Sequence, residues 1–108
     1  MKARLITVCL TFVLLGPEVR ANTILGSGAT SCGKWLAEQN EPFLHRGRRL
    51  WVLGYLSGLN KFSSVDFLKN FEVDGIAAAI DKYCRENPLK DMNDAADDVA
   101  RQMIRMTK

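Results

Sequence analysis

Hydrophobic residues recur at spacings of three and four along most of this sequence, and no segment shows the strict alternation of a half-buried strand. The first periodic segment follows Thr30 and Ser31, either of which can cap the free N–H groups at the start of a helix. It ends before Pro42, and residues 41–47 are mostly polar. The pattern therefore predicts a helix followed by a loop.

The next segment, residues 48–62, is apolar around most of its helical circumference, which is typical of a central helix packed on several sides. Each of its interior glycines, Gly54 and Gly58, costs about 1 kcal/mol of helix stability relative to alanine. They are four residues apart and so share one face. We expect this face to pack closely on the alanine-rich helix that follows, so that Gly54→Leu would destabilise the fold by a steric clash.

Two further helices are predicted after a connector over 61–74, which holds a short helical turn near 66–70. One runs from Asp74 to Glu86. The other opens at Asn87-Pro88, a capping residue followed by a proline at the first helical position. Its apolar residues repeat at helical spacing: Leu89, Met92, Ala96, Val99, Met103 and Met106. The predicted fold class is all-α, a small single-domain bundle of four main helices.

The first 21 residues have the pattern of a secretory signal peptide, with a basic start, the apolar run Leu5 to Leu15 and small residues near the cleavage site. This run is shorter than the roughly 20 residues of a membrane-spanning helix, so a membrane anchor is the less favoured alternative. We expect a signal over 1–21 and a periplasmic domain over 22–108. Its first part, 22–30, is predicted to be an extended or mobile lead, with no membrane association after cleavage.

Removal of this segment changes the charge balance of the chain. The segment carries three of the fifteen basic and one of the twelve acidic side chains, so the net charge falls from +3 to +1. A nearly neutral domain does not favour nucleic acid or an anionic membrane as a partner.

The cysteine count also becomes simpler, because Cys9 leaves with the signal and Cys32 and Cys84 remain in a compartment where disulfides form. One bridge between them is the simplest interpretation. Closing a loop of about 50 residues restricts the unfolded chain by roughly 4 kcal/mol. The alternative, a catalytic thiol, needs an activating base, and the sole histidine, His45, lies in the polar segment beside three arginines.

Motifs for other chemistry are weak. The glycines at 26–28 follow no strand and lack the later glycine and lysine of a phosphate loop. One histidine and two bridged cysteines leave only carboxylates for a metal, and the aspartates near the last helix form no calcium loop. The carboxylate pair Asp94 and Asp97 is better explained by a solvated helix face than by acid-base catalysis. The sequence predicts a binding protein without cofactor or metal, not an enzyme.

Three stretches, SCGKWLAEQ, WVLGYLSGLN and DGIAAAIDKYCRENPL, resemble the Tai-type immunity proteins, which neutralise cell-wall amidase effectors of type VI secretion. The resemblance covers nearly all of the chain after the signal. It is carried by elements that match in order: Cys32 and Trp35, Gly54-Tyr55 with Gly58, Asp81, Tyr83-Cys84, and Pro88-Leu89. A more distant similarity is to HdeA-like acid-stress chaperones.

The resemblance implies an exported, disulfide-bonded helical domain, often a homodimer, that occupies the active-site cleft of an amidase effector. The first hypothesis is therefore inhibitory binding to such a periplasmic enzyme. From the residues themselves, the partner-binding surface is predicted in the connector, at Phe62, Ser63, Ser64, Asp66 and Phe67, where aromatic side chains accompany polar ones and the helical pattern fails.

Alternatives remain at this point. Phe67, Leu68 and Phe71 could instead cap the hydrophobic core. The protein could also be an acid-activated chaperone, because protonation of its carboxylates would leave a strongly positive, self-repelling chain. A third possibility is an exported helical protein with another binding role.

Overall fold

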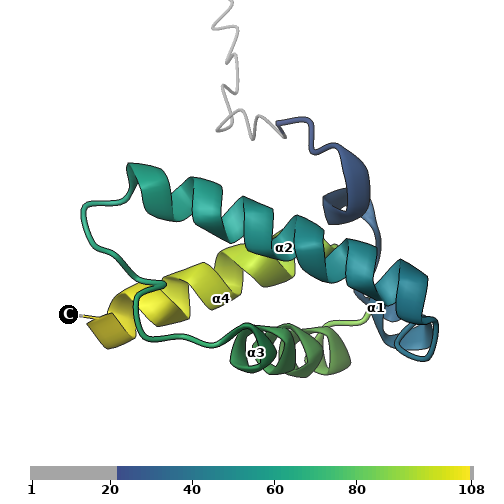
Figure 1. Cartoon of the computed structure of the whole chain (residues 1–108). Coiled ribbons are helices and arrows are strands. Elements are labelled where there is room, and N and C mark those ends of the chain that lie inside the picture. Colours follow the sequence, from purple (N-terminus) through teal and green to yellow (C-terminus); the bar gives the residue numbers. More distant parts are fainter. Residues whose placement is uncertain (1–21, 108) are drawn as a thin grey trace, which may run out of the picture.

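The computed structural model describes residues 22–107, and this part of the chain confirms the predicted all-α fold with four main helices (Figure 1). The predicted signal peptide lies outside the described residues. A short 3-10 helix precedes the α-helices, and the elements are η1 (Gly26–Ala29), α1 (Cys32–Ala37), α2 (Pro42–Phe62), α3 (Val73–Glu86) and α4 (Met92–Thr107). The only β-type pairing within 22–107 is a single bridge between Ser31 and Asp91.

The central helix is α4, which packs against α1, α2, α3 and η1. It buries six side chains: Met92, Ala95, Ala96, Val99, Ala100 and Met103. The three alanines among them let neighbouring helices approach closely. The prediction of a central helix over 48–62 is wrong, because α2 fully buries only Val52 and Leu56 and lies at the surface of the bundle (Figure 1).

Helix α2 also begins earlier than predicted, since residues 42–47 are helical rather than a loop. Pro42 occupies its first position, where a missing N–H group has no intrahelical partner to lose. The N–H of His45 donates to the carbonyl of Glu41 at 2.9 Å, which closes the first turn. Much of this first part of α2 is exposed, so its few apolar residues do not recur at the spacing that identifies a helix in sequence.

The turn between α3 and α4 is part of the packing of α1. The sequence predicts the last helix from the Asn-Pro pair after α3, but α4 begins at Met92. The carbonyls of Lys90 and Pro88 accept hydrogen bonds from the first two N–H groups of α1, at Cys32 (2.7 Å) and Gly33 (3.0 Å). This turn satisfies helix-start donors that otherwise need a capping side chain. Leu89, predicted on the core face of the last helix, is 96% exposed in the turn.

Part of the segment before α1 packs against α2 and α4 instead of extending into solvent. The indole Nε1 of Trp51 donates to the carbonyl of Leu25 at 3.0 Å, and the amide of Asn93 donates to the carbonyl of Gly28 at 2.9 Å. A Cβ atom at the buried Gly28 would lie 2.1 Å from the Trp51 ring. Only glycine allows η1 to lie this close to α2, and the predicted mobile lead is therefore wrong for η1.

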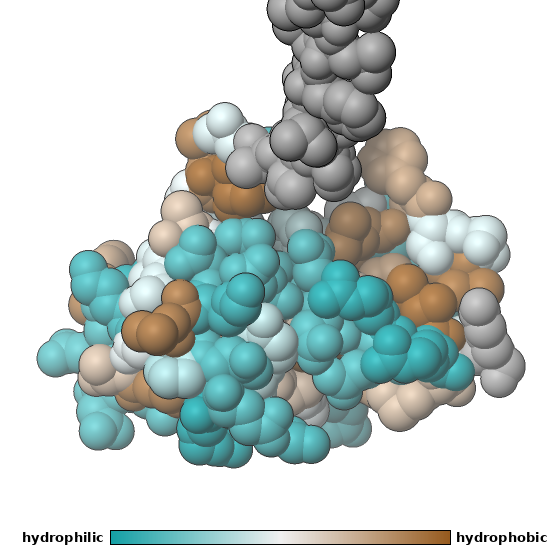
Figure 2. All heavy atoms as spheres, turned by 180° about the vertical axis from the view of Figure 1, so that it is seen from behind, coloured by the Kyte–Doolittle hydropathy of each residue, from teal (hydrophilic) through white to brown (hydrophobic). Residues whose placement is uncertain are grey.

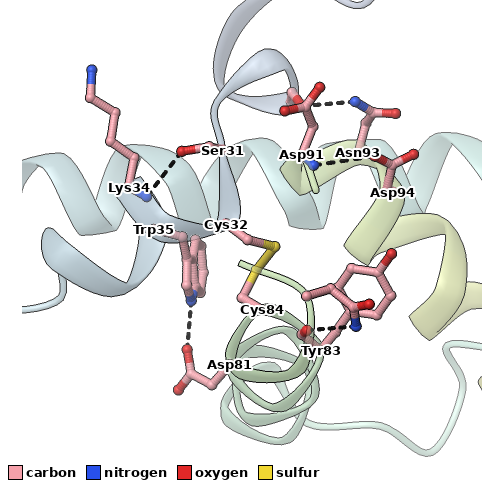
Figure 3. The surroundings of a disulfide bond; sticks show 12 residues. Ser31, Cys32, Lys34, Trp35, Asp81, Tyr83, Cys84, Asp91, Asn93 and Asp94 are labelled. Carbon is pink, nitrogen blue, oxygen red and sulfur yellow. Dashed lines mark hydrogen bonds between the residues drawn. A yellow bond between two sulfur atoms is a disulfide. The ribbon is translucent and has the colours of Figure 1, made fainter. Parts of the chain in front are cut away.

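The disulfide joins Cys32 at the start of α1 to Cys84 near the end of α3, as predicted (Figure 3). Both cysteines are fully buried, and so is Trp35. The Trp35 indole N–H donates to Asp81 Oδ1 at 2.6 Å, which ties α1 to α3 a second time one turn from the bridge (Figure 3).

Candidate partner-binding surface

The connector between α2 and α3 is held in place by one side chain at the end of α2. The Asn60 amide donates to Asp66 Oδ1 at 2.8 Å, while its Oδ1 accepts from the N–H of Phe67 at 2.9 Å. Ser63 Oγ accepts from the N–H of Val65 at 3.2 Å. A segment without regular secondary structure is thereby fixed at several points, and a fixed loop loses less entropy on binding a partner.

Phe67 fastens the connector from the inside. Its side chain is 1% exposed and belongs to the hydrophobic core, with Val65 and Leu68 partly buried against the same core. The alternative in which these aromatic and apolar residues cap the core is therefore the correct one for Phe67 and Leu68. Phe67 cannot contact a partner in this conformation, so the prediction that it belongs to the partner-binding surface is wrong.

The other four predicted residues lie at or near the surface. Phe62 is 88% exposed, Ser64 and Asp66 are exposed, and Ser63 is half-buried. The Phe62 side chain borders a groove of about 420 Å³ between the end of α2 and α4, lined further by Leu59, Arg101 and Ile104. An aromatic side chain beside a partly apolar groove is a surface that a protein partner can cover.

Other apolar residues of α2 also face outward. Phe43 is 89% exposed, Leu50 is 59% exposed, and Leu44 and Leu59 are exposed in smaller part. A surface helix normally turns polar residues to solvent, and contiguous exposed apolar patches mark interaction sites. The face of the molecule opposite to that of Figure 1 is mostly hydrophilic with separate hydrophobic patches (Figure 2).

Gly54 and Gly58 do not pack against the alanine-rich helix as predicted. A Cβ atom added at either position would meet nothing within 4 Å, and both residues are exposed. The reason is the rotation of α2, which turns Val52 and Leu56 toward the core and the glycines away from it. The predicted clash of Gly54→Leu is not expected in this arrangement.

Tyr55 lies on a different side of α2, over the acidic side of α4. Its ring stacks on Trp51 at a centroid distance of 5.0 Å, and its hydroxyl donates to Asp97 Oδ1 at 2.5 Å. Burial first, and then the hydrogen bond and charge of Asp97, raise the pKa of Tyr55 to about 12. The hydroxyl therefore stays a neutral donor that links α2 to α4.

Tyr83 has a similar environment on α3. Burial and the nearby charges of Asp94 and Asp98 raise the pKa of its phenol. Asp91, Asp94 and Asp97 line a hollow of about 500 Å³ beside Tyr55. Asp94 Oδ2 accepts from the N–H of Asp91 at 3.2 Å, so this carboxylate serves the start of α4. These contacts are explained by helix packing without a reaction.

Within residues 22–107, no group of three or more histidine, cysteine, aspartate or glutamate side chains is arranged to hold a metal ion. None of the helices described there combines the length and apolar character needed to cross a membrane.

Two side chains of α2 make contacts that were not identified from the sequence. Asn60 fixes the connector, and the only signal for it is its place at the end of a helix, where a side chain that both donates and accepts can serve a following loop. His45, predicted in a polar loop, lies in α2 with its ring 4.8 Å from the ring of Trp35. No sequence pattern indicates that contact, because it depends on how α1 and α2 cross.

Comparison of the chain with family models, with curated proteins and with solved structures finds no match.

Proposed function

We propose that this protein is an exported periplasmic binding protein of the immunity type, which inhibits a peptidoglycan amidase effector of type VI secretion. The observation that carries the proposal is the outward apolar side of α2, which ends in Phe62 at 88% exposure beside a connector fixed by Asn60 and Phe67. A rigid frame that presents an aromatic side chain next to polar loop residues is suited to filling a cleft.

The resemblance of Cys32, Trp35, Gly54, Tyr55 and Cys84 to the Tai-type pattern supports the same proposal from the sequence side. In this account Phe62 at the end of α2 and the connector residues Ser63, Ser64 and Asp66 would contact the effector. The expected homodimer would cover part of the outer side of α2, and the signal over 1–21 would direct the chain to the periplasm.

Inhibition of a purified cell-wall amidase encoded beside this gene tests the proposal. We expect the mature chain, residues 22–108, to form a stable complex with the amidase and to abolish its activity. Phe62→Ser should raise both the dissociation constant and the inhibition constant at least tenfold, about 1.4 kcal/mol. Leu89→Ser is the matched control, because Leu89 is equally exposed at 96% but lies in the turn after α3. Equal loss in both variants, or no loss in either, would contradict the assignment of the surface.

An acid-activated chaperone is the second candidate, and one set of contacts favours it. Three contacts between helices end on carboxylates: Trp35 to Asp81, Tyr55 to Asp97, and Arg49 to Asp74. Acid would leave the chain strongly positive, and repulsion among its basic side chains would strain these contacts and loosen the bundle. Suppression of client aggregation at pH 2 to 3 but not at pH 7 would support this candidate, and an unchanged oligomeric state and fold across that range would reject it.

A further inference from the structure

A second groove, of about 540 Å³, lies between the first three turns of α2 and the start of α3. Its apolar side is formed by Leu50 and Leu53 of α2 and by Val73 of α3. Leu50 is 59% exposed and Val73 is 48% exposed, so this apolar surface is open to solvent. The groove is separate from Phe62, which lies at the other end of α2.

The charged residues of this groove all have one sign. Arg46 and Arg49 line it together with His45, and no acidic side chain does. Arg49 pairs with Asp74 at 2.7 Å, but Asp74 is 91% exposed, and such surface pairs are weak enough to be exchanged. No side chain within 22–107 forms an ion pair or hydrogen bond with the Arg46 guanidinium. The acidic hollow beside Tyr55 has the opposite charge, with three aspartates and no basic side chain.

His45 also lines the groove, and one of its ring nitrogens has no hydrogen-bond partner among the described residues. Its ring packs against Trp35, and this nitrogen, Nδ1, is buried. Buried polar atoms without partners are rare in folded proteins.

We propose that this groove, lined by Arg46, Arg49 and His45 on its polar side, binds an acidic peptide segment that carries an aliphatic side chain next to its carboxylates. The carboxylates pair with Arg46 and Arg49, since guanidinium groups bind carboxylates in bidentate geometry. The aliphatic side chain covers the surface of Leu50 and Val73. A small inorganic anion would leave that apolar surface exposed, which favours a peptide. The groove is independent of the proposed function, because its test requires no amidase.

The test is an NMR titration of the mature chain with an acetylated, amidated pentapeptide of alternating glutamate and leucine. A matched peptide with glutamine in place of glutamate serves as the control. We expect saturable shifts for the amides of residues 39–53 and of Val73 with the acidic peptide, at least tenfold weaker binding of the glutamine peptide, and weaker binding at higher salt.

Variants localise the effect. We expect Arg46→Glu to raise the dissociation constant for the acidic peptide at least tenfold, while Arg105→Glu, an exposed arginine at the end of α4, changes it less than twofold. Leu50→Gln is a second variant, which tests the apolar contact if Arg46→Glu fails to fold. A spectrum that retains the dispersion of the native protein shows that each variant is folded.

Any of the following results would overturn the proposal: no shifts, equal binding of both peptides, shifts confined to residues outside the groove, or equal effects of Arg46→Glu and Arg105→Glu. Groove shifts that depend on protein concentration without peptide would identify a second copy of the chain as the occupant, and would equally reject it.

Discussion

The disulfide end of the molecule and the outer side of α2 differ in how far their apolar side chains are buried. Around the disulfide, Cys32, Trp35 and Cys84 are fully buried. The first N–H groups of α1 donate to carbonyls in the turn between α3 and α4. On the outer side of α2, Phe43 and Phe62 are almost fully exposed, and the glycines between them face open space.

This difference distinguishes residues that stabilise the fold from residues that contribute little to its stability. At the disulfide end, side chains from α1, α3 and the turn satisfy one another, so substitutions there should change stability. The exposed apolar side chains of α2 contribute little to the folded monomer, and burying them requires another molecule. The predictions below test this division, from the largest expected effect to the smallest.

Replacing both Cys32 and Cys84 by serine should lower the free energy of unfolding by about 4 kcal/mol, because the unfolded chain regains the entropy of a loop whose ends are 52 residues apart. Urea unfolding followed by circular dichroism measures the change. The same experiment on Phe62→Ser, as a control on the other region, should give a change within about 0.5 kcal/mol. A loss below about 1 kcal/mol for the double serine variant would show that the bridge is not a main constraint.

Phe67→Ala and Phe62→Ala compare two phenylalanines in or beside one connector. Phe67→Ala should cost about 3 kcal/mol, because it removes a fully buried ring and leaves a cavity. Phe62→Ala should leave the unfolding midpoint nearly unchanged, since its ring is exposed. Thermal unfolding of both variants checks the pair. Similar losses would mean that Phe62 also packs in solution.

Gly28→Ala and Gly54→Ala compare a glycine that the fold requires with one that it does not. At Gly28 the new methyl group would overlap the Trp51 ring, and we expect a loss of about 1 to 3 kcal/mol. At Gly54 the methyl group meets open space inside a helix, so stability should rise by about 0.5 to 1 kcal/mol. A loss at Gly54 would restore the close-packing interpretation of the sequence.

Alkaline pH should weaken the bundle through Tyr55. Its pKa is about 12 in the folded state against about 10 in an unfolded chain, so the fold favours the protonated phenol. The stabilisation is complete below pH 10 and is lost as the pH rises toward 12. Urea midpoints measured from pH 9 upward should fall for the wild type and fall less steeply for Tyr55→Phe. Identical slopes would show that Tyr55 does not carry the effect.

The helices and the disulfide were largely predictable, because the sequence patterns that indicate them involve residues close together in the chain. The single bridge follows from the two cysteines that remain after the predicted signal, and the helical periodicity of the last helix places Met92, Ala96, Val99 and Met103 on its buried face. A capping residue before Cys32 marked the start of α1, and Ser31 Oγ indeed accepts from the N–H of Lys34 at 3.1 Å.

The remaining features depend on how helices pack, which periodicity does not specify. The apolar residues of α2 exceed what one core can bury, so their pattern could not show which of them face α4. Pro88 fits the first turn of a helix, but its carbonyl accepts from Gly33 of α1, a contact between segments far apart in sequence. The same limit applies to the connector, where the burial of Phe67 depends on the position of Asn60.

Photo-crosslinking in the periplasm tests the central claim, that Phe62 and its connector form the partner surface, most directly. A benzophenone amino acid placed at Phe62 should yield a single covalent adduct whose partner is identified by mass spectrometry as a peptidoglycan amidase. The same probe at Leu89, which is equally exposed, should yield none. An adduct from Leu89 alone, or no adduct from Phe62 in a folded protein with the amidase present, would contradict the account.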